Sequence, residues 1–167
     1  MPQLELTPAP AALASLASYT SAGLVIPRLR EADTPGVINE LSQALQREGA
    51  VPDLLPFYHT ALNQELLSTT SVTGGLAFPH ARLSGVKRLR FAFGRAPRPI
   101  NWAGKSAWPV QLVFLVAIPA TDAACYLHLL ASLARLGQRA ELVEELRATE
   151  ESEAILAVFD KIKIRKG

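Results

Sequence analysis

Hydrophobic residues recur at helical spacing in the first half of the chain and predict two helices there. The first lies between Thr34-Pro35, a hydroxyl N-cap followed by proline at the first helical position, and Gly49. The second is expected to begin at Asp53. Its predicted buried face holds apolar residues three or four positions apart: Leu55, Tyr58, Leu62 and Leu66.

Three further helices are predicted in the last third of the chain. One follows Thr121 or Asp122, either of which can cap it. It carries a single apolar stripe made of Leu127, Leu130 and Leu133. The other two are expected over residues 139–148 and 150–160.

Two longer strands are predicted between these helical regions. Residues 86–94 alternate, with Leu89, Phe91 and Phe93 on one face and Arg88, Arg90 and Ala92 on the other. This alternation predicts a strand with one solvent-exposed face. Residues 110–118 are apolar throughout, as expected of a central strand that is covered on both faces. A short edge strand is predicted over residues 24–26, before Pro27.

Helices and strands mixed in this order indicate an α/β fold, a single domain with a mixed β-sheet sandwiched between helices. The domain is expected to span residues 23–160. Residues 1–22 are expected to form an N-terminal arm with a short helix near residues 11–18, and residues 161–167 a basic C-terminal tail.

Composition indicates a globular protein: 49% of the 167 residues are hydrophobic and 19% are charged. The single cysteine, Cys125, excludes an internal disulfide and fits a reducing compartment. The apolar run over residues 110–118 is too short to cross a bilayer, and the N-terminus shows no signal peptide. A cytoplasmic location without membrane insertion is therefore expected.

Positive charge is concentrated in the middle of the chain. No acidic residue lies between Glu65 and Asp122, a stretch that contains seven cations: Arg82, Lys87, Arg88, Arg90, Arg95, Arg98 and Lys105. Such a stretch favours an anionic ligand or an acidic partner, although solvated strand and loop positions would account for most of these cations. No aromatic residues interleave with them as a stacking platform would need, so no nucleic-acid partner is expected.

The most informative segment runs from Ser68 to Arg82, where a hydroxyl- and glycine-rich loop leads into a short apolar strand and a Pro-His pair. The strand, residues 76–78, is expected to stop at Pro79. His80 would then stand at the edge of the sheet, with Arg82 pointing to the same side. An imidazole held beside hydroxyls, backbone N–H groups and a guanidinium suits a phosphoryl group, although a structural histidine would give the same pattern.

Other kinds of site have less support. His59 fits a surface position, and His128 lies on a small, polar helix face where an exposed histidine without a function is also possible. No pair among the three histidines has the spacing of a helical metal site, so no metal is expected. The chain contains no nucleophile elbow, Walker A motif or dinucleotide fingerprint.

Several of these motifs together resemble one family, the fructose/mannitol-type enzyme IIA domain of the bacterial phosphoenolpyruvate-dependent sugar phosphotransferase system, which includes nitrogen-regulatory members. Ser68-Thr69, the glycine-rich turn and Leu-Ala-Phe-Pro-His-Ala-Arg are similar to its active-site motif. The segment 99–102 is similar to its Pro-Ile-x-Trp segment, and residues 113–119 to its central strand. Residues 128–134 resemble the His-Leu-x-x-Leu helix that carries its second histidine.

The resemblance implies a phosphohistidine relay without a cofactor. His80 would accept the phosphoryl group from a histidine-containing phosphocarrier protein and pass it to an enzyme IIB. His128 would bind the phosphoryl oxygens or steady His80. Physical arguments agree, because phosphoryl transfer needs positioning and charge stabilisation. The expected phosphate-binding groups are Arg82, Ser68, Thr69, Gly74 and Gly75.

One departure from the family pattern leaves two hypotheses open. The family has an Arg-Glu pair before Ser-Thr, and alignment on Ser68-Thr69 places Asn63 and Gln64 there, with a loop one residue longer. The protein is therefore expected to be either a phosphotransferase component or a regulatory member that controls partner proteins by binding, with weak or no onward transfer.

Overall fold

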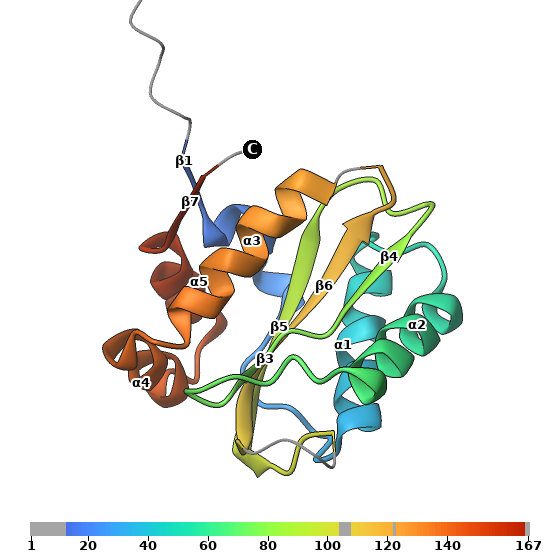
Figure 1. The fold of residues 1–167 in the computed structure, drawn as a ribbon. Helices are drawn as coiled ribbons and strands as arrows, with labels where there is room; N and C mark the ends of the chain where they lie inside the picture. Colours follow the sequence, from blue (N-terminus) through green and yellow to red (C-terminus); the bar gives the residue numbers. More distant parts are fainter. Residues whose placement is uncertain (1–12, 104–107, 122, 166–167) are drawn as a thin grey trace, which may run out of the picture.

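A mixed five-stranded sheet runs through the middle of the molecule, with helices on both of its faces (Figure 1). The computed structural model describes residues 13–103, 108–121 and 123–165. The path of the sheet is β2-β5-β6-β3, and β4 pairs with β6 beyond β3. The strands are β2 (Val25–Ile26), β3 (Leu76–Ala77), β4 (His80–Leu83), β5 (Arg90–Ile100) and β6 (Val110–Pro119). This arrangement confirms the predicted α/β class.

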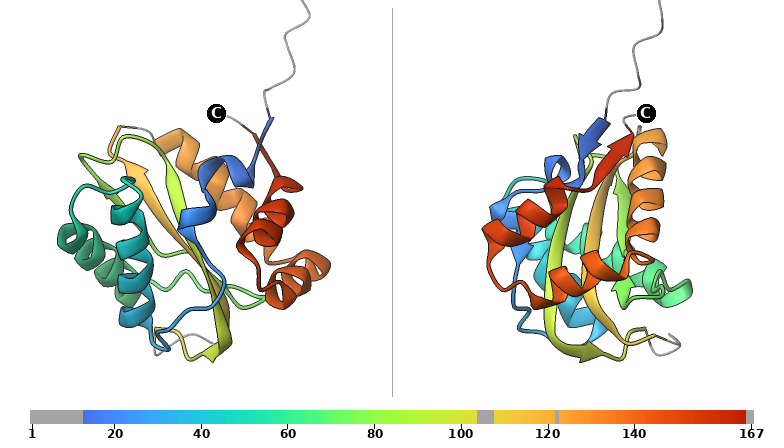
Figure 2. Two further views of the ribbon diagram at one scale, coloured as in Figure 1. Left: turned by 180° about the vertical axis from the view of Figure 1, so that it is seen from behind. Right: turned by 90° about the vertical axis from the view of Figure 1, so that its left-hand side faces the viewer.

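The two long strands, β5 and β6, are antiparallel, whereas β2, β3 and β4 run parallel to their long neighbours. Two helices cover one face of the sheet, α1 (Thr34–Arg47) and α2 (Leu54–Leu67). Three cover the other, α3 (Ala123–Leu136), α4 (Ala140–Ala148) and α5 (Ser152–Asp160) (Figure 2). The predicted helices are thus present, most with ends shifted by one or two residues.

Residues 91–96 of β5 are buried on both faces, which corrects the prediction of one solvent-exposed face. Phe91 and Phe93 belong to the core on the α3–α5 side, and Ala92 to the core beneath α1 and α2. The residues on the second face of this segment are small, so other parts of the chain can pack closely against it. A Cβ on Gly94 would lie 2.6 Å from Leu29 Cδ2, so this face accepts a closely packed neighbour instead of water.

Two features of the predicted helices differ in the structure. The N-cap of α1 is Asp33, whose Oδ1 accepts from the Gly36 N–H at 2.7 Å, while Thr34 is the first helical residue. In α2 the buried residues are Phe57, Ala61 and Glu65. The leucines that the periodicity assigned to the core, Leu55 and Leu66, are 59% and 57% exposed.

The two ends of the described chain meet in a second, two-stranded sheet. Here β1 (Leu13–Ser15) pairs antiparallel with β7 (Lys163–Arg165), and Figure 2 shows them side by side. Two 3₁₀ turns follow β1, η1 (Leu16–Tyr19) and η2 (Ala22–Leu24). From residue 13 onwards the expected arm therefore packs on the domain, as does most of the expected tail.

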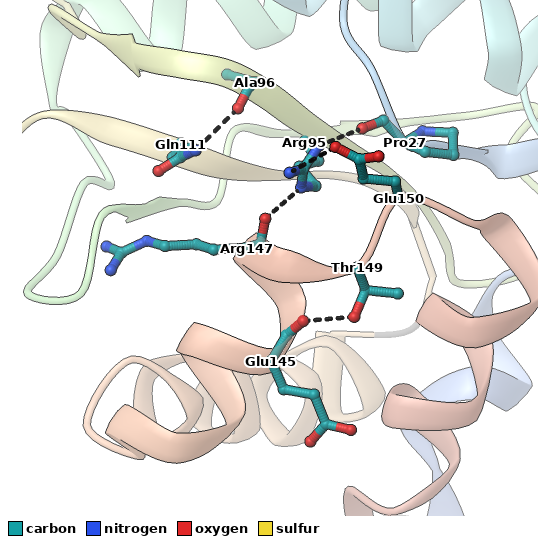
Figure 3. Close-up of polar contacts among 8 residues, drawn as sticks. All are labelled: Pro27, Arg95, Ala96, Gln111, Glu145, Arg147, Thr149 and Glu150. Carbon is teal, nitrogen blue, oxygen red and sulfur yellow. Dashed lines mark hydrogen bonds and ion pairs between the residues drawn. The ribbon is translucent and has the colours of Figure 1, made fainter.

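Arg95, on β5, is one of the cations of the middle segment, yet it is 9% exposed and structural (Figure 3). Its Nε donates to the carbonyl of Arg147 at 2.6 Å and its Nη1 to the carbonyl of Pro27 at 3.2 Å. Its Nη2 lies 3.9 Å from Glu150. Arg95 thus ties the end of α4 and the loop after β2 to the sheet. Its charge is already engaged by these groups.

Candidate functional site

His80 lies at the first position of β4, beside a pocket of about 300 Å³. Ala81 is fully buried, and the residues on either side of it, His80 and Arg82, both line the pocket. This confirms the expectation that an extended chain would point the two side chains to one side. The other lining residues come from α2, β6 and α3: Gln64, Ile118, Tyr126 and Leu127.

Pairing with β6 continues past Pro79, which corrects the expectation that the strand ends there. Pro79 has no N–H, but its carbonyl accepts from the Val116 N–H at 2.9 Å, and His80 is the register partner of Val116. The strand is at the edge of the sheet, where proline is tolerated. His80 is therefore held by a β-ladder and not by a free loop.

The imidazole of His80 is fixed through one of its two nitrogens. Nδ1 lies 3.0 Å from the carbonyl oxygen of Phe78. A carbonyl only accepts, so the Nδ1 of a neutral ring carries the proton in this bond. The other nitrogen, Nε2, then has a free lone pair, and no described residue forms a hydrogen bond with it. A neutral, outward nucleophile is what covalent chemistry at histidine requires.

A buried carboxylate, Glu65, organises the loop that leads to this histidine. Glu65 is 1% exposed, and its Oε1 accepts from Trp102 Nε1 at 2.8 Å and from the Thr70 N–H at 2.8 Å. The Thr70 hydroxyl lies 2.9 Å from Oε2. Several hydrogen bonds compensate for burying the charge, as a buried carboxylate needs. The sequence interpretation gave Glu65 no role.

Thr70 connects this carboxylate to the histidine backbone. Its hydroxyl donates to Glu65 and accepts from the Phe78 N–H at 2.7 Å. Since the carbonyl of the same Phe78 accepts from His80 Nδ1, a continuous chain of hydrogen bonds runs from Trp102 to the imidazole.

Ser68 and Thr69, two hydroxyl residues predicted to bind phosphate, lie outside the lining of the pocket beside His80. Ser68 is the exposed C-cap of α2, where its N–H donates to the carbonyl of Gln64. The Thr69 hydroxyl lies 3.2 Å from Glu65 Oε1 and 3.2 Å from Ser71 Oγ. Among the described residues, neither side chain lines the pocket beside His80.

The glycines predicted to bind phosphate, Gly74 and Gly75, are not brought to the imidazole. The Gly75 carbonyl accepts from the N–H groups of Gln111 and Leu112, whereas His80 pairs with Val116, about four residues or 13 Å further along β6. A Cβ on Gly74, at φ +96°, would lie 2.6 Å from the carbonyl oxygen of Gly137. Gly74 thus permits a close approach to the α3–α4 junction, and Gly75 a close approach to Arg147 and Pro109.

Arg82 supplies a cation to the pocket while it holds the end of β6. Its Nε donates to the carbonyl of Ala120 at 3.0 Å, and its Nη2 donates to the same oxygen. The guanidinium has five N–H groups, so it keeps donors that no other described residue takes. It is exposed enough to contact an anion placed on His80.

Helix α3 places Tyr126, and not His128, against His80. The two rings of Tyr126 and His80 have centroids 5.3 Å apart and are tilted by 41°. Burial raises the pKa of the Tyr126 phenol above its ordinary value of 10.0. Within the described part of the chain, no hydrogen bond or ring contact joins His128 to His80.

The sequence contains a pattern that points to Tyr126 instead of His128. A His-Leu-x-x-Leu pattern that starts at His128 needs leucine at position 132, where the chain has Ser132. Starting two residues earlier, Tyr126 is followed by Leu127 and Leu130 at the required spacing. Tyrosine therefore occupies the position that the pattern gives to histidine.

His59 does not line the pocket beside His80. His59 is exposed on α2, with its ring centroid 5.1 Å from that of Tyr58. In the described ranges, no cluster of three or more His, Cys, Asp or Glu could hold a metal ion. No helix of the described chain is long and apolar enough to cross a membrane.

Comparison with known sequences identifies relatives of two kinds. A family model described as "Phosphoenolpyruvate-dependent sugar phosphotransferase system, EIIA 2" matches residues 18–162. A nitrogen regulatory protein of Bradyrhizobium diazoefficiens is 34% identical over 128 residues, which cover 73% of this chain and 84% of that protein. A fructose-specific EIIABC component of Bacillus subtilis is 32% identical over 127 residues, but these cover 75% of this chain and only 20% of that longer protein.

Solved structures share the fold. Nitrogen regulatory protein IIA-Ntr of Neisseria meningitidis superimposes with a TM-score of 0.71 at 22% identity, covering 86% of this chain and 98% of that one. The mannitol-specific enzyme IIA of Escherichia coli, in its complex with phosphorylated enzyme IIB, gives a TM-score of 0.70 at 16% identity, covering 83% and 95%.

The contacts of Glu65 also change how the chain is placed against the family motif. If Thr69-Thr70 takes the place of the family's Ser-Thr, the Arg-Glu pair falls on Gln64 and Glu65, and the extra loop residue disappears. The acidic member is then present and buried. The basic member is replaced by Gln64, which lines the pocket beside His80.

Proposed function

This chain belongs to the EIIA 2 family of the phosphoenolpyruvate-dependent sugar phosphotransferase system, and we propose that it carries a phosphoryl group on Nε2 of His80. The donor in this proposal is a histidine-containing phosphocarrier protein. The acceptor is an enzyme IIB or a regulated protein, and the exchange takes place in the cytoplasm. The solved complex of mannitol enzyme IIA with phosphorylated enzyme IIB supports an acceptor of this kind.

The observation that carries the proposal is the hydrogen bond between His80 Nδ1 and the Phe78 carbonyl. It selects the tautomer whose Nε2 lone pair is free, and it remains intact when a bond to phosphorus forms at Nε2. Arg82 lies on the same side of β4, where it can offer charge-assisted hydrogen bonds to the phosphoryl oxygens. Ile118 and Leu127 give the pocket part of its apolar lining.

In the proposed step the Nε2 lone pair of His80 attacks the phosphorus of the donor phosphohistidine in line with the leaving nitrogen. The N–P bond of the donor breaks as the N–P bond to His80 forms, and the donor nitrogen keeps the electron pair. Onward transfer reverses these roles at the acceptor. Because the phosphoryl group moves between two nitrogens of similar chemistry, positioning and charge stabilisation are the main requirements on the protein.

A regulatory role is the second candidate, and one observation favours it. The position of the family's arginine is Gln64, so the pocket has one cation fewer than the motif would supply. A missing charge-assisted hydrogen bond costs about 1.5–3 kcal/mol of phosphoryl stabilisation. The 34% identity to a nitrogen regulatory protein points in the same direction. In this case His80 phosphorylation would switch binding to a partner, with slow onward transfer.

The experiment is phosphorylation of the protein with phosphoenolpyruvate, enzyme I and the phosphocarrier, followed by intact mass measurement. We expect a gain of one phosphate that is absent in His80→Ala and present in the matched control His59→Ala. Phosphorus NMR should identify the Nε2 isomer. No gain of mass with an active carrier would refute the proposal. If the phosphate is gained, its transfer to a cognate enzyme IIB would separate a transport role from a regulatory one.

A further inference from the structure

Tyr126 has a geometric relationship to His80 that no other described residue of α3 shares. The rings face each other at 5.3 Å, and both side chains line the same pocket. The phenol ring packs against the imidazole at a tilt of 41°, and this contact involves no hydrogen bond between the two side chains. The orientation of the imidazole is therefore set by two contacts, the Phe78 carbonyl at Nδ1 and the phenol ring of Tyr126.

The hydroxyl of Tyr126 is available to a ligand as far as the described residues are concerned. No hydrogen bond to any other described residue involves it, although the side chain is partly buried. A phenol hydroxyl without a hydrogen-bond partner in the protein is free to bond to a ligand in the pocket that its side chain lines. Because burial raises its pKa above 10.0, the hydroxyl keeps its proton at neutral pH and can donate it to an anion.

We propose that Tyr126 is a phosphoryl-binding residue, whose hydroxyl donates a hydrogen bond to an oxygen of the phosphoryl group on His80 while its ring holds the imidazole in place. This inference rests on the proposed function of His80. It assigns to a tyrosine the role that the sequence pattern gave to His128. The phosphoryl oxygens then have two donors in this chain, the neutral hydroxyl of Tyr126 and the cationic guanidinium of Arg82. Gln64, at the position of the family's arginine, adds no charge.

A consequence is that the two parts of the side chain have separable effects. The hydroxyl acts on the phosphoryl group alone, so Tyr126→Phe should leave the unphosphorylated protein as stable as the parent. The ring acts on the imidazole as well, so Tyr126→Leu should disturb the free protein too. Replacement by histidine restores an N–H donor at the same helix position.

The test is the rate of His80 phosphorylation as a function of phosphocarrier concentration in the parent, Tyr126→Phe, Tyr126→Leu and Tyr126→His. We expect Tyr126→Phe to lower kcat about 10- to 100-fold with little change in KM, since one hydrogen bond to a charged group is removed. Tyr126→His should recover part of the loss. Tyr58→Phe, which removes the hydroxyl of the tyrosine paired with His59, is the matched control and should match the parent.

A spectroscopic readout separates binding from a purely structural effect. Phosphorylation of the parent should shift the carbon resonance of the Tyr126 ring atom that bears the hydroxyl, and Tyr126→Phe should shift the phosphorus resonance of the phosphohistidine. Unchanged kcat and an unchanged phosphorus resonance in Tyr126→Phe would overturn this inference while His80 phosphorylation stands. Failure of the parent itself to be phosphorylated would overturn the proposed function and this inference together.

Discussion

Replacing Thr70 by valine removes one hydroxyl from the loop that holds His80, and we expect the change to reduce both stability and phosphorylation. Valine keeps the size and branching of threonine. The hydroxyl it lacks both donates to Glu65 and accepts from the Phe78 N–H. The substitution therefore cuts the hydrogen-bond chain between the buried carboxylate and the residue whose carbonyl fixes the imidazole.

The size of the effect follows from the two bonds. Leaving the buried Phe78 N–H without an acceptor costs about 1–3 kcal/mol, and the lost bond to the carboxylate is worth about 1.5–3 kcal/mol. Bonds within one network are not additive, so we expect a total of about 2–4 kcal/mol. Thr70→Ser is the matched control, because it keeps the hydroxyl and loses one methyl group, worth about 1 kcal/mol.

Urea unfolding followed by tryptophan fluorescence measures this difference, since Trp102 donates to the same carboxylate. With a typical dependence on urea, the midpoint of Thr70→Val should fall by about 1–2 M. Phosphorylation of His80 should slow in Thr70→Val and stay near the parent rate in Thr70→Ser. If the two variants unfold at the same midpoint and react at the same rate, the hydrogen-bond chain does not support the site.

Two further predictions concern Gly74, which lies away from His80, and Tyr126, which lies against it. Gly74→Ala should lower the urea midpoint more than Gly49→Ala, because both positions have positive φ but only the first Cβ would collide, at 2.6 Å from the Gly137 carbonyl. The rate of phosphorylation per folded molecule should not change, and a slower rate at equal stability would return Gly74 to the phosphate site. For Tyr126, the raised pKa means that the folded protein holds the phenolic proton more tightly than the unfolded chain. Relative to the ionised phenol, the bound proton stabilises the folded protein, and this difference is present below pH 10.0 and lost as the pH rises through the folded pKa. Alkaline titration of phenolate absorbance should therefore lose a step above pH 10.0 in Tyr126→Phe, and identical titrations would contradict this.

The parts of the site that local geometry determines could be predicted from the sequence. An extended chain alternates its side chains, so His80 and Arg82 had to share a side wherever the strand lay. Proline at position 79 directed attention to the edge of a sheet. These predictions needed no knowledge of distant segments, and the structure places both side chains on one pocket.

The parts that depend on tertiary contacts could not be predicted in the same way. Helical periodicity placed Leu66 in the core and overlooked Glu65, because hydrophobicity alone ranks a leucine above a carboxylate. The opposite result follows from Trp102, which reaches α2 from the segment after β5, and from Thr70, in the loop directly after α2. Both donate hydrogen bonds to the Glu65 carboxylate. Gly74 and Gly75 suggested a phosphate loop, yet glycine serves equally where two backbones approach.

The pairing of β1 with β7 has a consequence for the order in which the molecule is completed. Leu16 is fully covered, and its N–H donates to the carbonyl of Ile162 at 2.8 Å, across almost the whole length of the polypeptide. A contact between residues so far apart in the sequence closes a very large loop. Because closing this loop costs conformational entropy that no local contact offsets, we expect the contact to form late in folding. During synthesis Leu16 therefore stays without this partner until Ile162 has emerged from the ribosome, and a chain interrupted before that point cannot form the contact.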